Sequence, residues 1–586
     1  MVKGGQLMKR DLDHADLCMV NALVYNSYFK RFDEADVYIK DGKFLYIDKK
    51  KEKKLTSDKI IDTGGLYMIP GLCDIHMHIE SSMVTPLSFC EYTAKNGLTS
   101  IVSEPHEIAN VCGMKGIEAM IASGKESPYD CYYAIPSNVP ILSREFETSG
   151  GTITFEDMLK LKDEENVLCL GEVMNYSAII EEDDSEVAKF IEKVHSEDPY
   201  YVLEGHCPAL KDLDLAKYLY LGIGSDHCTH DMEELVQRFE NGMFVQLQDV
   251  MVTQEVIDYV CENRLYEHFC FVTDDTLPDV LVNKGHLDAV VRKAIGLRMK
   301  AEDAIYCATY TPCKRMGLSD RGSIAPGKLA DFVLLNELES LHIVSTYKKG
   351  IRIYDEKETE ETDKTYDLSP SFEDSIHHEL LKKEDLKICV EGEDRFVDVR
   401  VMKLYPGNNK SDEIFVKMPV KDHELLWKGS GCQLCAVIER HGRDGKIALG
   451  FSQGGIKKGA CASSYAHDSH DLIAMGNDEE DMILSINEVI MKKGGIATSM
   501  NGKITSLIEL PIAGLLSRKS VKETAKDFEA VRKAFDAQGY EHINNIMNFT
   551  LLSLSCIPTL KLTDRGYLNT ETFEKPSLYE EIDPFQ

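Results

Sequence analysis

Ionisable side chains recur at the ends of short apolar segments in the first half of the chain. The segment PGLCDIHMHIESS contains His76 and His78, and later apolar segments lead into Glu172, His206 and His227. The full set of such residues is His76, His78, Glu104, His106, Glu107, Glu172, His206, Asp226, His227, Asp274 and Asp275. Imidazole and carboxylate groups are ligands for Zn, Fe or Mn, and a carboxylate-rich site favours Fe or Mn. The pattern therefore predicts a metal site that several chain segments assemble.

The spacing of the histidines predicts which of them share an ion. Side chains two residues apart on a strand point the same way, so His76 and His78 can reach one ion. His206 and His227 end consecutive segments, which makes them neighbours across a sheet and able to share a second ion. A carboxylate between two cations offsets their charge, and Glu172 is placed to bridge them. We therefore expect a two-metal site.

The segments that carry these residues predict an α/β fold. They are GLCDIHMH, LTSIVSE, CYYAIPS, VLCLGEV, YVLEGHC, LGIGSDHC, MFVQLQD and HFCFVTDD, each followed by enough chain for a helix. Continuous apolar strands joined by crossovers indicate a parallel sheet. Eight repeats indicate a closed (β/α)₈ barrel, whose active site lies at the carboxyl ends of its strands. An open doubly wound sheet is the alternative, although no GxGxxG follows the first strand to suggest a dinucleotide site.

The flanking segments predict two further domains. Short strands are expected from about residue 18 to 68, with Asp41-Gly42 as a hairpin turn, and RGSIAPGKLADFVLLNE returns to strand after the barrel. The expected domains are a composite β-sandwich at 1–69 with 318–370, the barrel at 70–317 and a C-terminal α+β domain at 385–586. The charged segment TYKKGIRIYDEKETEETDKTYD is expected to complete the first sheet and continue as a solvated linker.

Composition limits the partners and the compartment. The formal net charge of the 586 residues is -33, which disfavours binding to nucleic acid or to an anionic membrane. No apolar signal region or membrane span is readable. Seventeen Cys are scattered without a repeating frame, which is typical of buried free thiols in a reducing compartment. We expect a cytoplasmic protein with a small-molecule substrate.

Three other motifs have weaker implications. Cys432 and Cys435 have zinc-like spacing but no second pair, so two buried thiols are expected. The glycines of GFSQGGIKKGACASS indicate a tight turn, since a phosphate loop would need Gly-Lys-Ser/Thr. In SYAHDSHDL, His467, Asp468 and His470 lie close together. That segment predicts either a capped helix start or a contribution to the active site.

The motifs taken together resemble a known family. PGLCDIHMHIESSMVTP, EPHEIANVCG, GEVMNY, EGHCP, SDH, TDDTLPD and AHDSHD are similar to bacterial adenine deaminases of the amidohydrolase superfamily, and the similarity runs from about residue 20 to the end. HIESS, PHEIANV and AHDSH are more specific than His-x-His alone. The resemblance implies a composite β-domain, a (β/α)₈ barrel, a C-terminal domain and two Mn²⁺ or Fe²⁺ ions per subunit. It also implies hydrolysis of adenine to hypoxanthine and ammonia, and we expect a homo-oligomer.

The resemblance also implies roles for individual residues. His76 and His78 would bind the first ion, His206 and His227 the second, and Glu172 would bridge them in place of the carboxylated lysine of relatives. Asp274 would bind the first ion and move protons, because Asp275 faces the opposite way on an ideal strand. Asp274 and Glu107 are the expected catalytic residues. The expected substrate-binding or supporting residues are Glu80, Ser81, Glu104, His106, Asp275, His467, Asp468 and His470.

The sequence departs from the family pattern in two places, and two other functions stay open. Glu104 stands where Asp is expected, and Cys228 follows SDH where an acidic residue is common. One alternative is an amidohydrolase acting on another cyclic amide or amidine, although such relatives usually carry lysine where this chain has Glu172. The other is a non-catalytic scaffold, although such proteins typically lose the metal ligands that this chain keeps.

Overall fold

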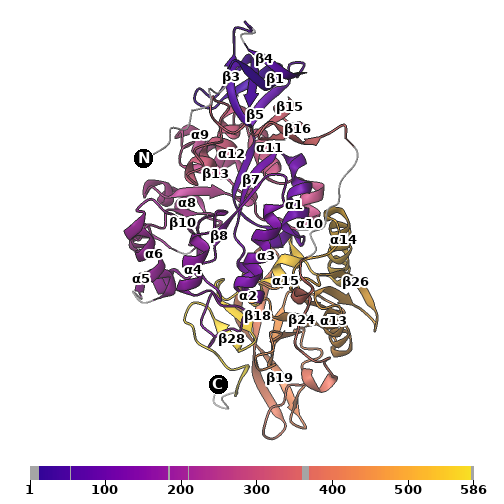
Figure 1. Ribbon diagram of the computed structural model, residues 1–586. Helices are drawn as coiled ribbons and strands as arrows, with labels where there is room; N and C mark the ends of the chain where they lie inside the picture. Colours follow the sequence, from indigo (N-terminus) through magenta and orange to yellow (C-terminus); the bar gives the residue numbers. More distant parts are fainter. Residues whose placement is uncertain (1–11, 53–54, 182–184, 209, 359–367, 582–586) are drawn as a thin grey trace, which may run out of the picture.

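The computed structural model describes residues 12–52, 55–181, 185–208, 210–358 and 368–581. The ribbon shows a small sheet at one end, helices around parallel strands in the middle, and a second large sheet at the other end (Figure 1). Of the predicted charged linker, residues 359–367 lie outside the described part of the chain. No helix in the described ranges has the length and apolar character that a bilayer crossing requires.

The first sheet joins the beginning of the chain to a segment that follows the central helices. Its eight strands run in the order β17-β16-β15-β5-β1-β2-β3, and β4 pairs with β1. The strands are β1 (His14–Asn26), β2 (Arg31–Lys40), β3 (Lys43–Asp48), β4 (Thr56–Asp62), β5 (Tyr67–Pro70), β15 (Phe332–Glu337), β16 (His342–Lys348) and β17 (Ile351–Asp355). Asp41 and Gly42 both have positive φ, 50° and 71°, as a two-residue hairpin turn requires. The predicted hairpin is therefore confirmed, and β15 pairs with β5 as the return to this sheet requires.

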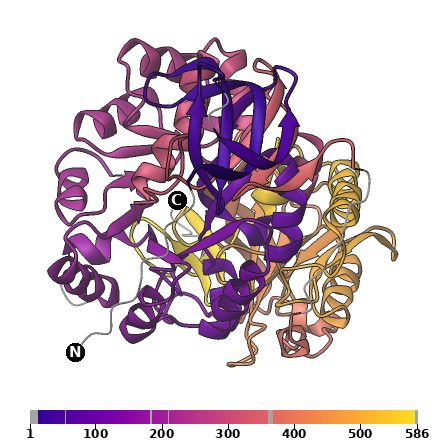
Figure 2. The ribbon, with the colours of Figure 1, turned by 45° about the horizontal axis from the view of Figure 1, so that its top comes forward.

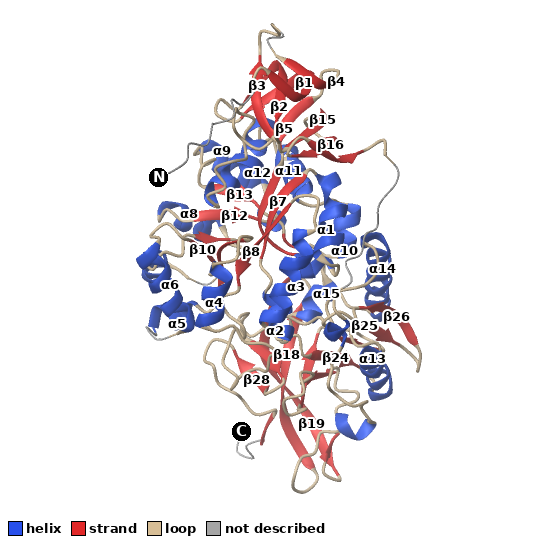
Figure 3. Ribbon diagram, in the orientation of Figure 1, coloured by secondary structure: helices blue, strands red, loops and turns tan. Residues whose placement is uncertain are grey.

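All eight predicted parallel strands are present in the middle of the molecule. They are β6 (Leu72–His78), β7 (Leu98–Ser103), β8 (Asp130–Ile135), β9 (Val167–Val173), β10 (Val202–Gly205), β11 (Ser225–Asp226), β12 (Phe244–Leu247) and a last strand divided into β13 (Phe269–Phe271) and β14 (Asp274–Asp275). The helices of this region are α1 (Pro86–Thr93), α2 (His106–Cys112), α3 (Met114–Lys125), α4 (Phe155–Lys162), α5 (Tyr176–Glu181), α6 (Glu186–Glu197), α7 (Asp212–Tyr220), α8 (Met232–Glu240), α9 (Gln254–Glu262), α10 (Pro278–Asn283), α11 (Leu287–Gly296) and α12 (Ala301–Arg315). Figure 3 shows these helices outside the strands.

The parallel strands form a curled sheet in two hydrogen-bonded sections. One section has the order β10-β9-β8-β7-β6-β14, and the other is β11-β12-β13. The first strand, β6, pairs with the last, β14, so the beginning and the end of the parallel-strand region lie side by side. Between β10 of the first section and β11 of the second, the amide of Gly224 donates to the carbonyl of Leu203 at 3.2 Å. The view turned by 45° shows how the strands and helices of this region curve around its centre (Figure 2).

The last third of the chain is built on a ten-stranded sheet. Its order is β20-β19-β18-β22-β21-β24-β23-β25-β26, and β29 pairs with β18. The strands are β18 (Arg395–Tyr405), β19 (Asn408–Lys421), β20 (Glu424–Leu425), β21 (Gln433–Ile438), β22 (Ile447–Gln453), β23 (Ala460–Ser463), β24 (Leu472–Gly476), β25 (Gly495–Ser499), β26 (Ile504–Glu509) and β29 (Tyr579–Glu581). The other elements are α13 (Glu479–Met491), α14 (Val521–Gln538), α15 (Asn545–Thr550) and the hairpin of β27 (Leu560–Thr563) with β28 (Gly566–Asn569). This region therefore contains both strands and helices.

The cysteines match their prediction. All seventeen are free, and most of them are buried, including Cys432 and Cys435. These two thiols lie among the buried side chains of the ten-stranded sheet region. Cys432 directly precedes β21 and Cys435 lies within it, and the Cys435 thiol donates to the Ser452 hydroxyl at 3.3 Å.

Buried polar contacts join the ten-stranded sheet region to the parallel-strand region. Glu147, in the segment after β8, accepts hydrogen bonds from the amide of Leu142 at 2.8 Å and from the Ser555 hydroxyl at 3.1 Å. Burial raises the pKa of Glu147 from 4.5 to about 7. The carboxyl group is therefore easier to ionise in the unfolded chain than in the folded protein.

This difference makes stability depend on pH in a known direction. As the pH rises above 4.5, Glu147 ionises in the unfolded chain but stays protonated in the folded protein, so the free energy of unfolding falls. It stops falling above about pH 7, where Glu147 is ionised in both states. We expect Glu147→Gln to raise the free energy of unfolding at pH 8 by up to about 3 kcal/mol and by much less near pH 5. Melting temperatures of both proteins across this range test it. An equal gain at pH 5 and pH 8 would contradict the assignment.

Candidate metal centre and its surroundings

The structure brings the six predicted metal-binding residues together at the carboxyl ends of the parallel strands. These residues are His76 and His78 of β6, Glu172 of β9, His206 after β10, His227 after β11 and Asp274 of β14. His76, His78, Glu172 and His227 are buried, and His206 and Asp274 are partly exposed. Strand ends position them because neighbouring parallel strands finish at one face.

The residues of β6 lie against Asp274 and Glu172. The Nε2 atoms of His76 and His78 are 3.6 and 3.3 Å from Oδ1 of Asp274, and Nε2 of His78 is 3.4 Å from Oε1 of Glu172. Nε2 of His76 is buried, yet it has no hydrogen-bond partner among the described residues. A buried nitrogen without a partner is costly unless something else binds it.

The second pair of histidines lies on the other oxygen of Glu172. Nδ1 of His206 and Nε2 of His227 are 2.9 and 3.2 Å from Oε2 of Glu172. The same two nitrogens are 3.1 Å apart. Glu172 therefore lies between the two pairs and contributes one oxygen to each.

The electrostatics of the site favour charged carboxylates. Burial opposes ionisation of Glu172, but the charges of His227 and His206 and their hydrogen bonds hold its pKa well below the usual value. Asp274 behaves in the same way beside His76 and His78. Burial, together with the charge of His227, lowers the pKa of His76 to about 4, so its imidazole is neutral at pH 7. Ionised carboxylates and the neutral imidazole of His76 are in the forms that bind metal. Burial opposes protonation of His227, but the charge of Glu172 outweighs it and raises the pKa of His227 to about 9, so that imidazole would lose a proton when metal binds.

The donor atoms also have the spacing that a metal site needs. Groups such as His76, His227 and Asp274, or His78, Glu104, His106 and Glu172, place one atom each within 4.8 Å of the others. Together with the unpartnered nitrogen of His76, this spacing shows that the residues fit divalent cations.

Asp275 does not point away from the site, so that part of the prediction is wrong. The backbone of Asp274 is left-handed, with φ 56°, and this interrupts the alternation of an extended strand. The Asp275 carboxylate instead accepts a hydrogen bond from the Ser81 hydroxyl. Its oxygen lies within 4.8 Å of donor atoms of His78 and Asp274. Both aspartates therefore face the metal centre.

The predicted supporting residues Glu104, His106 and Glu107 adjoin the centre at the beginning of α2. Nδ1 of His106 contacts the carboxylate of Glu104 and is 3.5 Å from Oε1 of Glu172. Nε2 of His106 is 3.5 Å from Oε1 of Glu107. The longer side chain of Glu104, where Asp was expected, thus reaches His106.

The loop between β23 and β24 completes this part of the site from the far end of the chain. Nδ1 of His467 is 2.7 Å from Oε1 of Glu107, and Nε2 of His470 contacts the other oxygen. Asp468 Oδ2 lies 3.7 Å from Nε2 of His106. Burial opposes ionisation of Glu107, but the charges of His467, His470 and His106 hold its pKa well below the usual value.

This loop is not the start of a helix, so that interpretation of SYAHDSHDL is wrong. Backbone groups that a helix would use bond elsewhere: the amide of His467 donates to the carbonyl of Thr550 at 3.1 Å, and that of Ser464 to Gly495 at 3.0 Å. The other interpretation, a contribution to the active site, agrees with the position of His467 and His470.

Glu80 and Ser81 lie in the short turn after β6. Burial, together with the charge of Glu107, raises the pKa of Glu80 to about 7. The Ser81 hydroxyl contacts Asp275 and is 2.9 Å from the hydroxyl of Tyr465, a residue of the β23–β24 loop. Ser81 therefore links the strand-end residues to the last third of the chain.

Several residues near the site carried no role in the sequence prediction. Gln248 donates to Oδ2 of Asp274 at 3.1 Å and to the carbonyl of His227 at 2.9 Å. Tyr465 approaches Ser81. Gln248 is next to last in the predicted strand segment MFVQLQD, and Tyr465 lies within SYAHDSHDL, so both positions were available signals. Cys228 is buried, which raises its thiol pKa well above the usual value and keeps it protonated.

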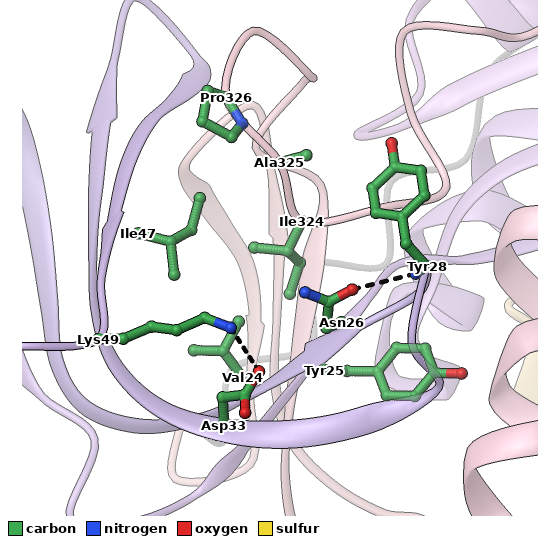
Figure 4. A pocket seen from close by; sticks show the side chains of 10 residues that line it. All are labelled: Val24, Tyr25, Asn26, Tyr28, Asp33, Ile47, Lys49, Ile324, Ala325 and Pro326. Atoms are coloured by element: carbon green, nitrogen blue, oxygen red, sulfur yellow. Dashed lines mark hydrogen bonds and ion pairs between the residues drawn. The ribbon is translucent and has the colours of Figure 1, made fainter.

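A separate cavity lies in the first sheet, away from these residues (Figure 4). It has a volume of about 170 Å³ and is lined by Val24, Tyr25, Asn26, Tyr28, Asp33, Ile47, Lys49, Ile324, Ala325 and Pro326. Lys49 and Asp33 pair across it at 2.6 Å. None of its residues belongs to the predicted site, and we assign it no role.

Comparison with known proteins gives the family of this chain. The amidohydrolase family model matches residues 67–198 and 178–353, and the model of the adenine deaminase C-terminal domain matches residues 410–574. An adenine deaminase of Clostridium perfringens is 42% identical over 570 residues, covering 96% of this chain and 99% of that protein. Adenine deaminase 2 of Shouchella clausii is 40% identical, covering 97% and 99%. The chain therefore belongs to the adenine deaminase family of amidohydrolases.

Proposed function

We propose that this protein hydrolyses adenine to hypoxanthine and ammonia. The observation that carries the proposal is the position of Glu172, which has one oxygen on each pair of histidines at the carboxyl ends of the strands. Relatives that match nearly the full chain are named adenine deaminases, and this supports adenine as the substrate.

We further propose two divalent ions, Mn²⁺ or Fe²⁺, per subunit. His76, His78 and Asp274 would hold the first ion, and His206 and His227 the second, with Glu172 shared. When bound, such ions lower the pKa of a water molecule from 15.7 to about 7, which supplies hydroxide at neutral pH. Histidine and carboxylate ligands suit either metal.

Two carboxylate side chains carry out the proposed proton transfers. Asp274, held by Gln248 and the β6 histidines, accepts the proton released as C6 is attacked and returns it to the leaving amino group. Glu107, held ionised by His467 and His470, faces the same site from α2, where it would accept a proton from one ring nitrogen and return it to another. The proposal keeps the predicted catalytic roles of both carboxylates.

We also propose the domain organisation that the resemblance to adenine deaminases implies. We propose that the two parallel sections close into one (β/α)₈ barrel at about residues 70–317. The composite β-domain at 1–69 with 318–370 and the C-terminal domain at 385–586 would complete the chain. A cytoplasmic location and a homo-oligomer are part of this proposal.

Ammonia release tests the proposal directly. Purified protein is assayed with adenine, adenosine and guanine, after chelation and again after addition of Mn²⁺. We expect activity on adenine alone, loss on chelation and recovery with Mn²⁺, together with two ions per chain by elemental analysis. Activity on adenosine but not adenine would overturn the substrate, and a protein that neither holds nor regains metal would overturn the reaction.

Replacement of Glu107 tests its proposed role. Glu107→Gln keeps the shape and both imidazole neighbours but cannot exchange a proton, so we expect kcat to fall by about 100-fold with two ions retained. Steady-state rates and metal content measure both quantities. A variant with unchanged kcat, or one that loses metal, would show that Glu107 does not act as an acid or base.

A further inference from the structure

A buried ion pair joins the two segments that carry the second pair of histidines. Nε of Arg238, in α8, lies 2.7 Å from Oδ2 of Asp226, and both side chains are fully buried. His230 donates from Nε2 to the same oxygen at 2.7 Å. Burial opposes ionisation of Asp226, but the hydrogen bond from His230 and the positive charges of His230 and Arg238 hold its pKa well below the usual value.

The pair holds backbone as well as side chains. Oδ1 of Asp226 accepts hydrogen bonds from the amides of Cys207 at 3.3 Å and Cys228 at 3.1 Å. Nη2 of Arg238 donates to the carbonyl of Cys207 at 2.6 Å. The segment after β10 is thus tied to the segment after β11 through two charged groups.

The residues that Asp226 and Arg238 connect lie next to the histidines of the second pair. His206 directly precedes Cys207, and Asp226 and Cys228 directly flank His227. A shift of either segment would move an imidazole that lies within 3.2 Å of Glu172. The β6 histidines have no hydrogen bond to Asp226 or Arg238 among the contacts of the described residues.

We propose that Asp226 and Arg238 are positioning residues for the second ion and set its affinity through His206 and His227. The inference rests on the proposed two-ion function. Groups that orient metal ligands typically contribute about 10- to 100-fold to metal affinity. A purely structural pair would lower stability without favouring either ion.

Arg238→Met is the principal variant, and Arg238→Lys keeps the charge but loses the planar group that reaches both Asp226 and Cys207. Arg315→Met is the matched control. Arg315 also forms a pair with a buried carboxylate on β10, Nε lying 2.8 Å from Oε1 of Glu204, but its hydrogen bonds among the described residues go to Leu203 and Glu204 within β10 and not to the segments after β10 and β11.

Equilibrium dialysis against Mn²⁺, and anomalous diffraction of crystals at low Mn²⁺, measure the occupancy of each ion. We expect the Kd of the second ion to rise by about 10- to 100-fold in Arg238→Met and less in Arg238→Lys, with the first ion unchanged. Excess Mn²⁺ should restore kcat. In Arg315→Met both ions should bind as in the natural protein, whatever happens to the melting temperature.

The outcomes separate this inference from the proposed function. If the natural protein binds fewer than two ions, the two-ion function fails. If it binds two, and Arg238→Met weakens both ions equally or neither, the positioning role is wrong. Should Arg238→Met not fold, Arg238→Lys and Arg315→Met still decide the question.

Discussion

Replacement of Asp274 by Asn is expected to leave both ions bound and to lower kcat by about 10³- to 10⁴-fold, because the side chain keeps one ligand oxygen but can no longer take up a proton. Oδ1 of Asp274 lies near both β6 histidines, and Oδ2 accepts a hydrogen bond from Gln248. One oxygen is thus placed for metal and the other is held in orientation. Steady-state kinetics with elemental analysis measures both effects.

Asp275→Asn is the matched control for this variant. Asp275 has the same side chain, is next in sequence and faces the same site, but its carboxylate contacts Ser81 and not the β6 imidazoles. We expect a loss of less than about tenfold, in the range of a single supporting hydrogen bond. If kcat fell more in Asp275→Asn than in Asp274→Asn, Asp275 and not Asp274 would be the residue that transfers the proton.

The positions of the strand-end residues were predictable because they follow from the local sequence pattern of buried parallel strands. Buried parallel strands are recognisable as continuous apolar runs, and their carboxyl ends meet at one face. The runs that contain His78, Glu172 and His227 therefore predict side chains close together, although the residues are far apart in sequence. The structure places their donor atoms within a few ångströms.

The exceptions follow from features that have no local signature. The left-handed backbone at Asp274 turns Asp275 into the site, and no pattern in TDDTLPD specifies that conformation. The pair of Asp226 and Arg238 depends on the packing of α8 under two strand ends. Residue type predicted an ionisable group at Asp226 but not what it would bind.

The contact between the β23–β24 loop and Glu107 was the least predictable. His470 and Glu107 are 363 residues apart, and Glu107 lies in α2 whereas His470 lies in the β23–β24 loop. Only tertiary packing joins them, so the sequence left a capped helix open as an equal interpretation. With this contact, the segment matched by the C-terminal family model contributes imidazoles directly to the site.

Replacement of Glu172 by Gln is expected to have the other large effect, on metal binding itself. Removing one partner from a buried charged contact costs about 3–5 kcal/mol, which corresponds to about 10²- to 10⁴-fold in affinity. Glu172 contacts His78 through one oxygen, and His206 and His227 through the other. The amide that replaces one oxygen cannot ligate, so at least one ion should be lost on dialysis and kcat/KM should fall at least as much.

Glu147→Gln is the control for the chemical change, because Glu147 is equally buried but its hydrogen bonds go to Leu142 and Ser555. We expect it to keep both ions and full activity at pH 7. If Glu172→Gln instead keeps two tightly held ions, the Glu172 carboxylate does not bridge them. Its only role between the histidine pairs would then be to orient the imidazoles. If it loses one ion and recovers activity with excess Mn²⁺, the carboxylate contributes affinity and the remaining ligands suffice for the reaction. The metal stoichiometry of this variant therefore decides whether the site works through one shared carboxylate, as its geometry predicts.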